Sequence, residues 1–327
     1  MQSMIKKITA LILAALFAAA FFGCSKTETP AKNTFDDIEI NPGADAAKTE
    51  SITATLYYAN SAGSLLVGES RSISAPVNDR VEVFILEELI KGPTVSGGNF
   101  NALINPNTRI VSISDSGDVL TVVLSVAFLS WPFDTEADNA SKQKKLAVYS
   151  IVNTLVEASG YPRVQILVDR DSSGAGQRIQ LSELGGSSEL ISGEAGVLGS
   201  LARNGDIVLT PKNTLNEIMR SMTTKDFSAI YEYIAYGDSY GHKRPDETAF
   251  SASVQSAPTV EGYSIGDEIV SDDGQSAVVM MDYTVRLSEG ETVTRTGVPA
   301  ALLKENGVWR QKYSAFEALF EGVEAEN

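Results

Sequence analysis

Between residues 51 and 184, apolar residues switch between the spacing of strands and the spacing of helices. Every second side chain of a strand faces one side, whereas side chains three or four apart share one face of a helix. This spacing predicts strands at 52–58 and 65–73, a helix from Asp79 capped by Asn78 and ended by Gly92-Pro93, a hairpin of 109–114 and 119–124, a helix around 148–155 and a strand at 164–168. The predicted fold class is α+β, a mostly antiparallel sheet with two helices on one face.

Residues 211–322 have a different order, with helices first and strands afterwards. Pro211 opens the first of two amphipathic helices. Their apolar faces consist of Leu215, Ile218, Met219 and Met222 in the first helix, and of Phe227, Ile230, Tyr231 and Ile234 in the second. Extended segments follow at 261–269, 276–287, 291–303 and 307–313, separated by glycine-containing turns. This order predicts helices with a curved antiparallel sheet that forms a cone.

Two segments with few large apolar residues divide the chain. Residues 24–50 contain prolines, a glycine and scattered charges, which predicts a flexible tether. Residues 185–210 are rich in glycine and serine. We interpret them as a linker, because no strand precedes the glycines and no Gly-Lys-Ser/Thr sequence follows, as a phosphate loop requires. The predicted domains are therefore 51–184 and 211–322.

Residues 1–23 have the pattern of a secretory signal peptide. Lys6 and Lys7 precede an apolar run at 8–22 that ends in Gly23. This run is too short for an ordinary membrane span, but it matches the apolar region of a signal peptide. We therefore expect the mature protein to lie outside the cytoplasm.

Cys24 follows this segment directly and is the only cysteine of the 327-residue chain. The Gly23-Cys24 boundary resembles a bacterial lipobox, which implies removal of residues 1–23 and acylation of Cys24, for example with palmitate. Each acyl chain contributes about 0.8 kcal/mol per buried methylene, so two or three chains would anchor the protein to membrane lipid on the extracytoplasmic face. The alternative is ordinary cleavage after 18–20, which would leave a free thiol.

The charge of the chain limits its partners. The sequence contains 26 basic and 42 acidic residues, a net charge of −16. Because the signal segment holds two lysines and no acid, the mature chain has a net charge near −18. So acidic a protein is repelled by nucleic acid, and we expect no nucleic-acid partner. A single cysteine also excludes a disulfide within the chain, so both domains depend on packed cores.

Five short segments of the first domain carry a resemblance to a known family. They are LIKGP at 89–93, INPNT at 104–108, VVLS at 122–125, IVNTL at 151–155 and VQILVD at 164–169. In this order they resemble the GerMN domain, a module of bacterial lipoproteins that is named after a sporulation and spore germination protein. The resemblance implies an adaptor without catalytic residues, and it implies protein partners in the cell envelope.

The order of elements in the second domain is similar to that of the nuclear-transport-factor-like (SnoaL-like) superfamily. Such cones enclose a pocket that serves catalysis, binding or only packing, so the likeness leaves the function open. An enzyme would most simply use His242, the only histidine, as general base. Its neighbours in sequence are Tyr236, Asp238, Tyr240 and Asp246. The glycine, proline and charges of 237–247 favour an exposed loop instead.

Other residues with chemical potential have simpler structural interpretations. Asp115 and Asp118 flank a glycine turn and supply too few oxygens at ligand spacing for calcium. Asp169 and Asp171 belong to a predicted solvated loop, and Trp309 is predicted to fill the cone. The first domain contains neither histidine nor cysteine, which excludes imidazole and thiolate chemistry there. We therefore predict no catalytic residues, no cofactor and no metal site.

These inferences together predict a lipoprotein of the cell membrane with a noncatalytic role in binding or assembly. Its expected processes are those of the cell envelope, sporulation and spore germination. The alternatives are small-molecule binding or catalysis in the C-terminal cone pocket, and binding to peptidoglycan through exposed aromatic side chains. Cys24 is the only residue for which the sequence predicts a chemical modification.

Overall fold

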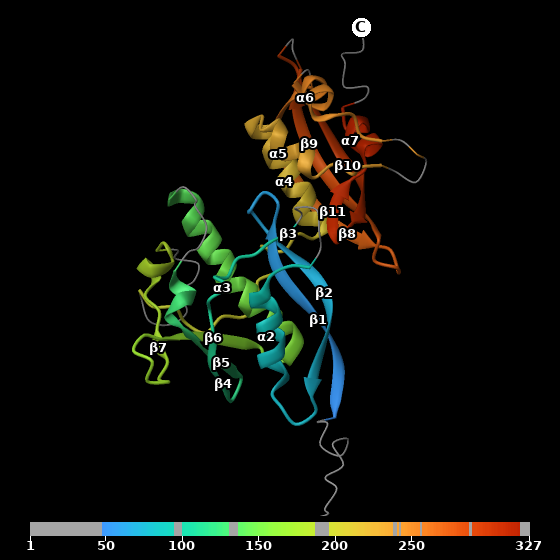
Figure 1. The fold of residues 1–327 in the computed structure, drawn as a ribbon. Helices are drawn as coiled ribbons and strands as arrows, with labels where there is room; N and C mark the ends of the chain where they lie inside the picture. The colour runs from blue at the N-terminus through green and yellow to red at the C-terminus, as the bar shows by residue number, and fades with distance from the viewer. Residues whose placement is uncertain are drawn as a thin grey trace, which may run out of the picture. The chain divides into compact units, whose positions relative to one another are not determined.

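The structure is a computed structural model that describes residues 48–94, 100–130, 137–186, 196–237, 241, 243–255, 257–287 and 290–320. Residues Ala47–Asn327 form one compact unit, and Met1–Ala46 lie outside the described residues. The fold is α+β, which confirms the predicted class (Figure 1). The division of the chain into two domains at 185–210 stays a prediction.

The N-terminal part contains two sheets. The three-stranded sheet has the order β2-β1-β3, and the four-stranded sheet has the order β4-β5-β6-β7. The elements are β1 (Thr49–Asn60), β2 (Leu66–Pro76), α2 (Val81–Lys91), β3 (Phe100–Asn101), β4 (Ile110–Ser116), β5 (Val119–Ser125), the 3-10 helix η2 (Val126–Leu129), α3 (Ala137–Ser159), β6 (Arg163–Asp169), β7 (Gln177–Arg178) and the 3-10 helix η3 (Leu181–Leu184). All strand pairs except β5 and β6 are antiparallel.

Helix α3 explains why the strands separate into two sheets instead of the single expected sheet. β5 and β6 are parallel, and a parallel pair needs a long crossover connection, which here contains α3. α3 also binds the backbone of β1, since Ser150 Oγ donates to the carbonyl of Tyr57 and Thr154 Oγ1 accepts from its N–H. The two bonds are 2.5 and 3.1 Å long. The helix therefore packs against both sheets.

The predicted start of α2 is wrong and its predicted end is right. The helix begins at Val81, and its N-cap is Arg80 in an extended conformation without a side-chain cap bond. Asn78 does not cap it, because the N–H of Asp79 still bonds the carbonyl of Pro76 in the turn after β2. At the other end, Gly92 has a φ of 94°, a conformation that favours glycine and stops the helix.

Residues 196–210 are packed, although the sequence predicts a linker over 185–210. Val197, Leu198, Leu201, Val208 and Leu209 are buried. Leu201 bridges antiparallel to β6, and Val208 bridges parallel to β2. These five apolar side chains account for the packing, and residues 187–195 lie outside the described residues.

The C-terminal part consists of helices and one four-stranded sheet. The sheet is antiparallel throughout, with the order β11-β10-β9-β8 (Figure 1). The elements are α4 (Pro211–Thr224), α5 (Phe227–Glu232), α6 (Glu247–Gln255), β8 (Thr259–Val270), β9 (Ser276–Arg286), β10 (Thr292–Glu305), β11 (Val308–Gln311) and α7 (Tyr313–Ala318). The two predicted helices and four strands are confirmed, whereas α6 and α7 were not predicted.

Local sequence explains where the first two of these helices begin. Thr210 Oγ1 accepts from the N–H of Asn213 at 3.1 Å and caps α4, and Pro211 occupies its first turn. Asp226 accepts from the N–H of Ala229 at 3.2 Å and caps α5. Lys225 between the helices has a φ of 58°, so the chain reverses there before α5 starts.

The sheet of the C-terminal part is curved, and its inner face is apolar. Register shifts interrupt its pairing between Ile265 and Glu268 and between Arg295 and Val298, and such bulges bend strands. The inner side chains of the sheet are buried together with those of the helices, and they include Val279, Met281, Tyr283, Ala300, Leu302, Leu215, Ile218, Met219 and Phe250. The predicted curved sheet is confirmed, and the likeness to the nuclear-transport-factor-like superfamily stays a prediction.

Candidate functional site

The predicted modification site, Cys24, lies outside the described residues. Its acylation therefore stays a prediction. Within the part of the chain that the structure describes, no helix is long and apolar enough to cross a membrane.

The structure describes only part of the cluster around His242. His242, Asp238 and Tyr240 lie outside the described residues. Asp246 Oδ1 accepts from the N–H of Ala249 at 2.9 Å, so this carboxylate caps the start of α6. Asp246 therefore has a structural role that does not require catalysis.

Tyr236 lies in a stack of aromatic rings and guanidinium groups. The Cζ atom of Arg244 is 3.9 Å from the ring centroid of Tyr231 and 4.3 Å from that of Tyr236. The Cζ atom of Arg310 lies 4.8 Å from the Tyr236 centroid. Arg310 is buried, and its Nε donates to the carbonyl of Glu232 at 3.1 Å. The two arginines thus join the end of α5 to β11 through cation–π contacts and backbone hydrogen bonds.

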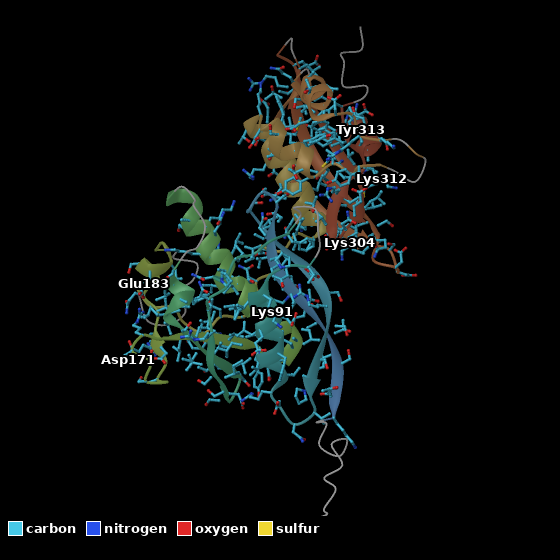
Figure 2. The ribbon with its side chains drawn as sticks, in the orientation of Figure 1. Lys91, Asp171, Glu183, Lys304, Lys312 and Tyr313 are labelled. Carbon is cyan, nitrogen blue, oxygen red and sulfur yellow. The ribbon has the colours of Figure 1, made fainter. Side chains whose placement is uncertain are left out.

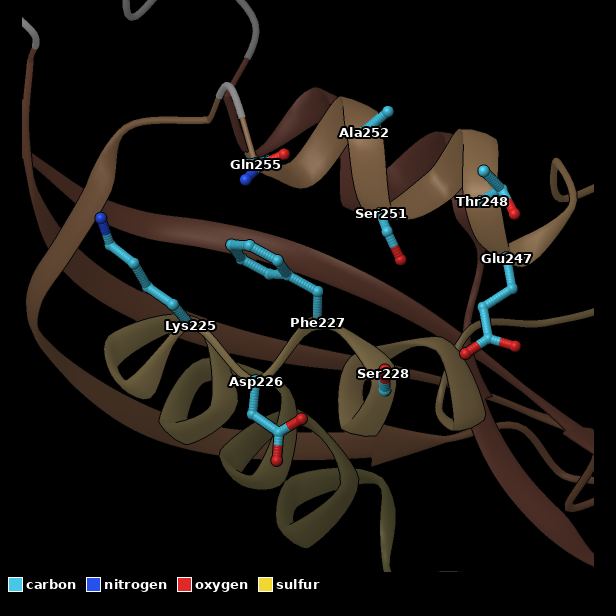
Figure 3. Close-up of a pocket in the computed structure, with 9 residues that line it drawn as sticks. All are labelled: Lys225, Asp226, Phe227, Ser228, Glu247, Thr248, Ser251, Ala252 and Gln255. Carbon is cyan, nitrogen blue, oxygen red and sulfur yellow. The ribbon is translucent and has the colours of Figure 1, made fainter.

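A shallow hollow of about 700 Å³ lies between α5 and α6 (Figure 3). The ring of Phe227 lies between the two helices, and Ser251 and Gln255 of α6 face it. The remaining lining residues are Lys225, Asp226, Ser228, Glu247, Thr248 and Ala252. The hollow is on the surface and is separate from the inner face of the sheet, so it is not the predicted cone pocket.

Gln311 is the unusual polar residue of the apolar interior. Its side chain is fully buried, and neither Nε2 nor Oε1 has a hydrogen-bond partner. Its backbone, in contrast, is paired, because its N–H donates to the carbonyl of Tyr233 and its carbonyl accepts from Ala235. A buried polar group without a partner costs about 1–3 kcal/mol.

We expect the Gln311→Met variant to be more stable than the wild-type protein by about 1–2 kcal/mol, because methionine has a similar volume without the amide. The free energy of unfolding in urea measures this change. Gln275→Met is the matched control, since Gln275 is exposed, and it should change stability by less than about 0.5 kcal/mol. A less stable Gln311→Met protein would mean that the amide has a partner.

The aspartates of the N-terminal part have structural roles. Asp115 Oδ1 accepts from Arg80 Nη2 at 2.7 Å, and this hydrogen bond lowers the pKa of the carboxyl. Asp118 is exposed in the turn beside Gly117, which has a φ of 57°. Trp309 of β11 is buried as predicted. Among the described residues, no group of three or more His, Cys, Asp or Glu side chains could hold a metal ion.

The solvated loop predicted at Asp169 and Asp171 needs a correction. Asp169 is buried, and its two carboxylate oxygens accept from the N–H groups of Ser173 and Gly174 at 3.2 and 3.0 Å. Of the two aspartates, only Asp171 is exposed. Asp169 therefore closes the loop from the inside, as short polar side chains commonly do in turns.

A polar cluster of the N-terminal part joins β2 to the end of α2. We call Glu69, Arg71 and Glu88 the ionic cluster. Arg71 Nη2 lies 2.6 Å from Glu69 Oε1, and Arg71 Nη1 lies 3.1 Å from Glu88 Oε2. The side chains of Arg71 and Glu69 are only 10% and 5% exposed. Lys91, which is labelled at the end of α2 in Figure 2, adds an exposed ion pair to Glu88 at 2.6 Å.

The ionic cluster fixes the chain just after α2. Arg71 Nη2 and the hydroxyl of Tyr58 both donate to the carbonyl of Gly92 at 3.0 Å. Glu69 accepts from the backbone N–H of Thr94 at 3.0 Å and from its hydroxyl at 2.5 Å. The LIKGP segment that carries the resemblance to GerMN domains is therefore held by buried charges.

The same contacts keep the carboxylates of the ionic cluster ionised. Burial alone raises the pKa of Glu69, but the hydrogen bonds from Thr94 and Arg71 outweigh it, and the pKa is lowered. The pKa of Glu88 is lowered mainly by its hydrogen bond with Lys91. Both groups are therefore acceptors committed to structural bonds, which is unsuitable for a general acid or base at neutral pH.

Sequence reasoning missed the ionic cluster and the paired arginines Arg244 and Arg310. A local signal existed for the first, because Glu69 and Arg71 are two residues apart in a predicted strand and so share one face. Nothing in the sequence indicated that Glu88 and Thr94 would meet them.

The N-terminal part is similar to a known protein family. Residues 55–172 match the Germane family, described as sporulation and spore germination. This match confirms the predicted likeness of the first domain to GerMN domains, and it includes the ionic cluster. It covers well under half of the chain, and residues 211–322 lie outside it.

Solved structures show weaker similarities. The tandem GerMN domains of the sporulation protein GerM from Bacillus subtilis are 17% identical, with a TM-score of 0.32 over 55% of this chain and 50% of that chain. A SEC-C motif containing protein from Rhodopseudomonas palustris is 16% identical, with a TM-score of 0.26 over 32% of this chain and 76% of that chain. Among the curated proteins, none matches this chain.

Proposed function

We propose that the protein is a lipoprotein on the extracytoplasmic face of the cell membrane and acts as a noncatalytic binding or assembly module in sporulation, germination or related envelope processes. The Germane match over residues 55–172 carries this proposal. The signal-like segment 1–23 and the lipobox-like Cys24 support the location.

The proposed mechanism is attachment. Acylation of Cys24 confines the folded residues to a surface, which raises their effective concentration near partners on that surface. The tether at 24–50 gives these residues reach. The net charge near −18 keeps nucleic acid from competing with envelope proteins for binding.

The structure lends less support to an enzyme in the cone. A catalytic cone would have polar groups converging in an enclosed cavity. The described inner face instead consists of packed apolar side chains, with Gln311 as its buried amide. Tyr236 and Asp246 serve in packing and capping.

Deletion and complementation in the native host test this proposal. We expect deletion to lower the number of heat-resistant spores or the rate of germination, and we expect the full chain to restore it. The Cys24→Ser variant should restore roughly tenfold less, because it loses the effective concentration that anchoring supplies. Ser25→Ala is the matched control and should restore fully. Normal spores and germination after deletion would contradict the proposed process.

A further inference from the structure

Four exposed apolar side chains lie near one end of the sheet in the C-terminal part, and three of them share its outer face. Ile269 is 71% exposed, Val270 42%, Val278 39% and Met280 37%. They belong to β8 and β9, next to the turn that joins these strands. Apolar residues that are exposed singly need no explanation, but a contiguous patch commonly marks an interaction surface.

Strand register places most of these side chains on the outer face of the sheet. Ile269 pairs with Val278, Val278 with Ala301, and Met280 with Pro299. The alternate residues of β9 are buried on the inner face. Ile269, Val278, Met280, Pro299 and Ala301 therefore form one surface across three strands, which we call the outer patch.

The rest of the same face is polar. Ser264 lies 3.5 Å from the carboxylate of Asp282, and the hydroxyls of Thr284 and Thr294 are 2.9 Å apart. An ion pair between Glu261 and Arg286 lies nearer the other end of β9. The exposed apolar side chains are therefore confined to one end of this face and are not spread over the whole sheet.

Carboxylates border the β8 side of the outer patch, whereas Lys312, whose N–H donates to the carbonyl of Ala301, adjoins its β10 side. Asp267 lies in the bulge of β8 beside Gly266, whose backbone approaches Met280. Asp272 and Asp273 lie in the turn between β8 and β9. Bonds from Ser271 and Gln275 lower the pKa of Asp273, so it is charged at neutral pH. Lys304, adjacent to this turn, directs its Nζ to the Trp309 ring, 5.6 Å from the centroid.

We propose that the outer patch is the docking surface for a partner protein that presents apolar side chains bordered by lysine or arginine. Charge complementarity determines the charge of this partner, because Asp267, Asp272 and Asp273 outnumber Lys312 at the border of the outer patch and the chain as a whole is acidic. A second copy would bring the same carboxylates and another net charge near −18 to the contact. The inference rests on the proposed binding role and does not depend on the lipid anchor.

Site-specific photo-crosslinking in the native host tests the docking surface. The variant Val278→p-benzoylphenylalanine carries the crosslinker in the outer patch, and Thr284→p-benzoylphenylalanine carries it at the polar end of the same strand and face. We expect the Val278 position to give an adduct with a different protein, at least about tenfold more abundant than at Thr284. Sequencing of the crosslinked peptide should show lysine or arginine beside apolar residues.

The double substitution Asp267→Lys and Asp272→Lys tests the charge border. Both side chains are exposed, and we expect the adduct to fall about fivefold or more while the thermal unfolding midpoint stays unchanged. If the lysine variant unfolds, Asp267→Asn with Asp272→Asn should give a smaller decrease. An adduct with a second copy, equal adducts at both positions, no adduct, or no effect of charge would overturn the proposal. Loss of the lipid anchor is distinguished from these outcomes, because it would release the protein from membranes.

Discussion

Replacing Cys24 with serine is expected to move nearly all of the protein from the membrane fraction to the soluble extracytoplasmic fraction. A serine hydroxyl cannot form the thioether that holds the lipid. Two or three acyl chains, at about 0.8 kcal/mol per buried methylene, supply the anchoring free energy, and the folded residues are too acidic to bind anionic headgroups. Fractionation of cells with and without detergent, followed by immunoblotting, measures this change.

Ser25→Ala is the matched control for this experiment, because it changes the neighbouring residue and leaves the sulfur in place. We expect this variant to remain in the membrane fraction. Unchanged membrane retention of Cys24→Ser would contradict the lipid anchor.

Replacing Arg71 with methionine is expected to lower the free energy of unfolding by about 3–5 kcal/mol. The substitution keeps much of the side-chain volume but leaves the carboxylate of Glu69 buried without its cation. It also removes one of the two donors to the carbonyl of Gly92, because the Tyr58 hydroxyl remains. Urea unfolding followed by circular dichroism measures the loss. Arg220→Met is the control, because Arg220 is 51% exposed in its pair with Glu217, and it should cost less than about 1 kcal/mol.

The pH dependence of this effect separates the charge from the packing. The pKa values of Glu69 and Glu88 are lowered in the folded protein. Their contribution to stability is therefore present above the unfolded pKa of about 4.3 and is lost as the pH falls through the folded values. We expect the difference between wild type and Arg71→Met to shrink as the pH falls from about 6 to about 3. A constant difference would assign the effect to packing alone.

The strands and turns of this protein could be predicted because their signals are local. The extended segment predicted at 276–287 coincides with β9 almost residue for residue. Asp272-Asp273-Gly274 gives the turn before β9, and Glu305-Asn306-Gly307 gives the turn between β10 and β11, where Gly274 and Gly307 have φ values of 66° and 82°. Both signals depend on neighbours in the sequence, which the fold does not override.

Features that depend on distant residues could not be predicted in the same way. Residues 196–210 pack because β2 and β6 offer them backbone partners, and composition alone suggested a linker. Helix α6 has few apolar residues, and its two buried ones, Phe250 and Val254, give a weak periodic signal. The parallel pairing of β5 with β6 depends on how α3 crosses between them.

The candidate sites also differ in whether they depend on neighbouring or on distant residues. The sequence suggested single acidic residues at turns, and the structure places Asp115 in an ion pair and Asp169 in a buried loop closure. The ionic cluster and the outer patch both combine side chains from two or more elements. Their members became recognisable only when strand register and helix packing brought them together.

The mass of the N-terminal peptide from the protein purified out of its native membrane tests the account most directly. We expect this peptide to begin at Cys24 and to carry a lipid on its sulfur, with residues 1–23 removed. A peptide with an unmodified Cys24 thiol, or one that begins elsewhere in the signal segment, would contradict it.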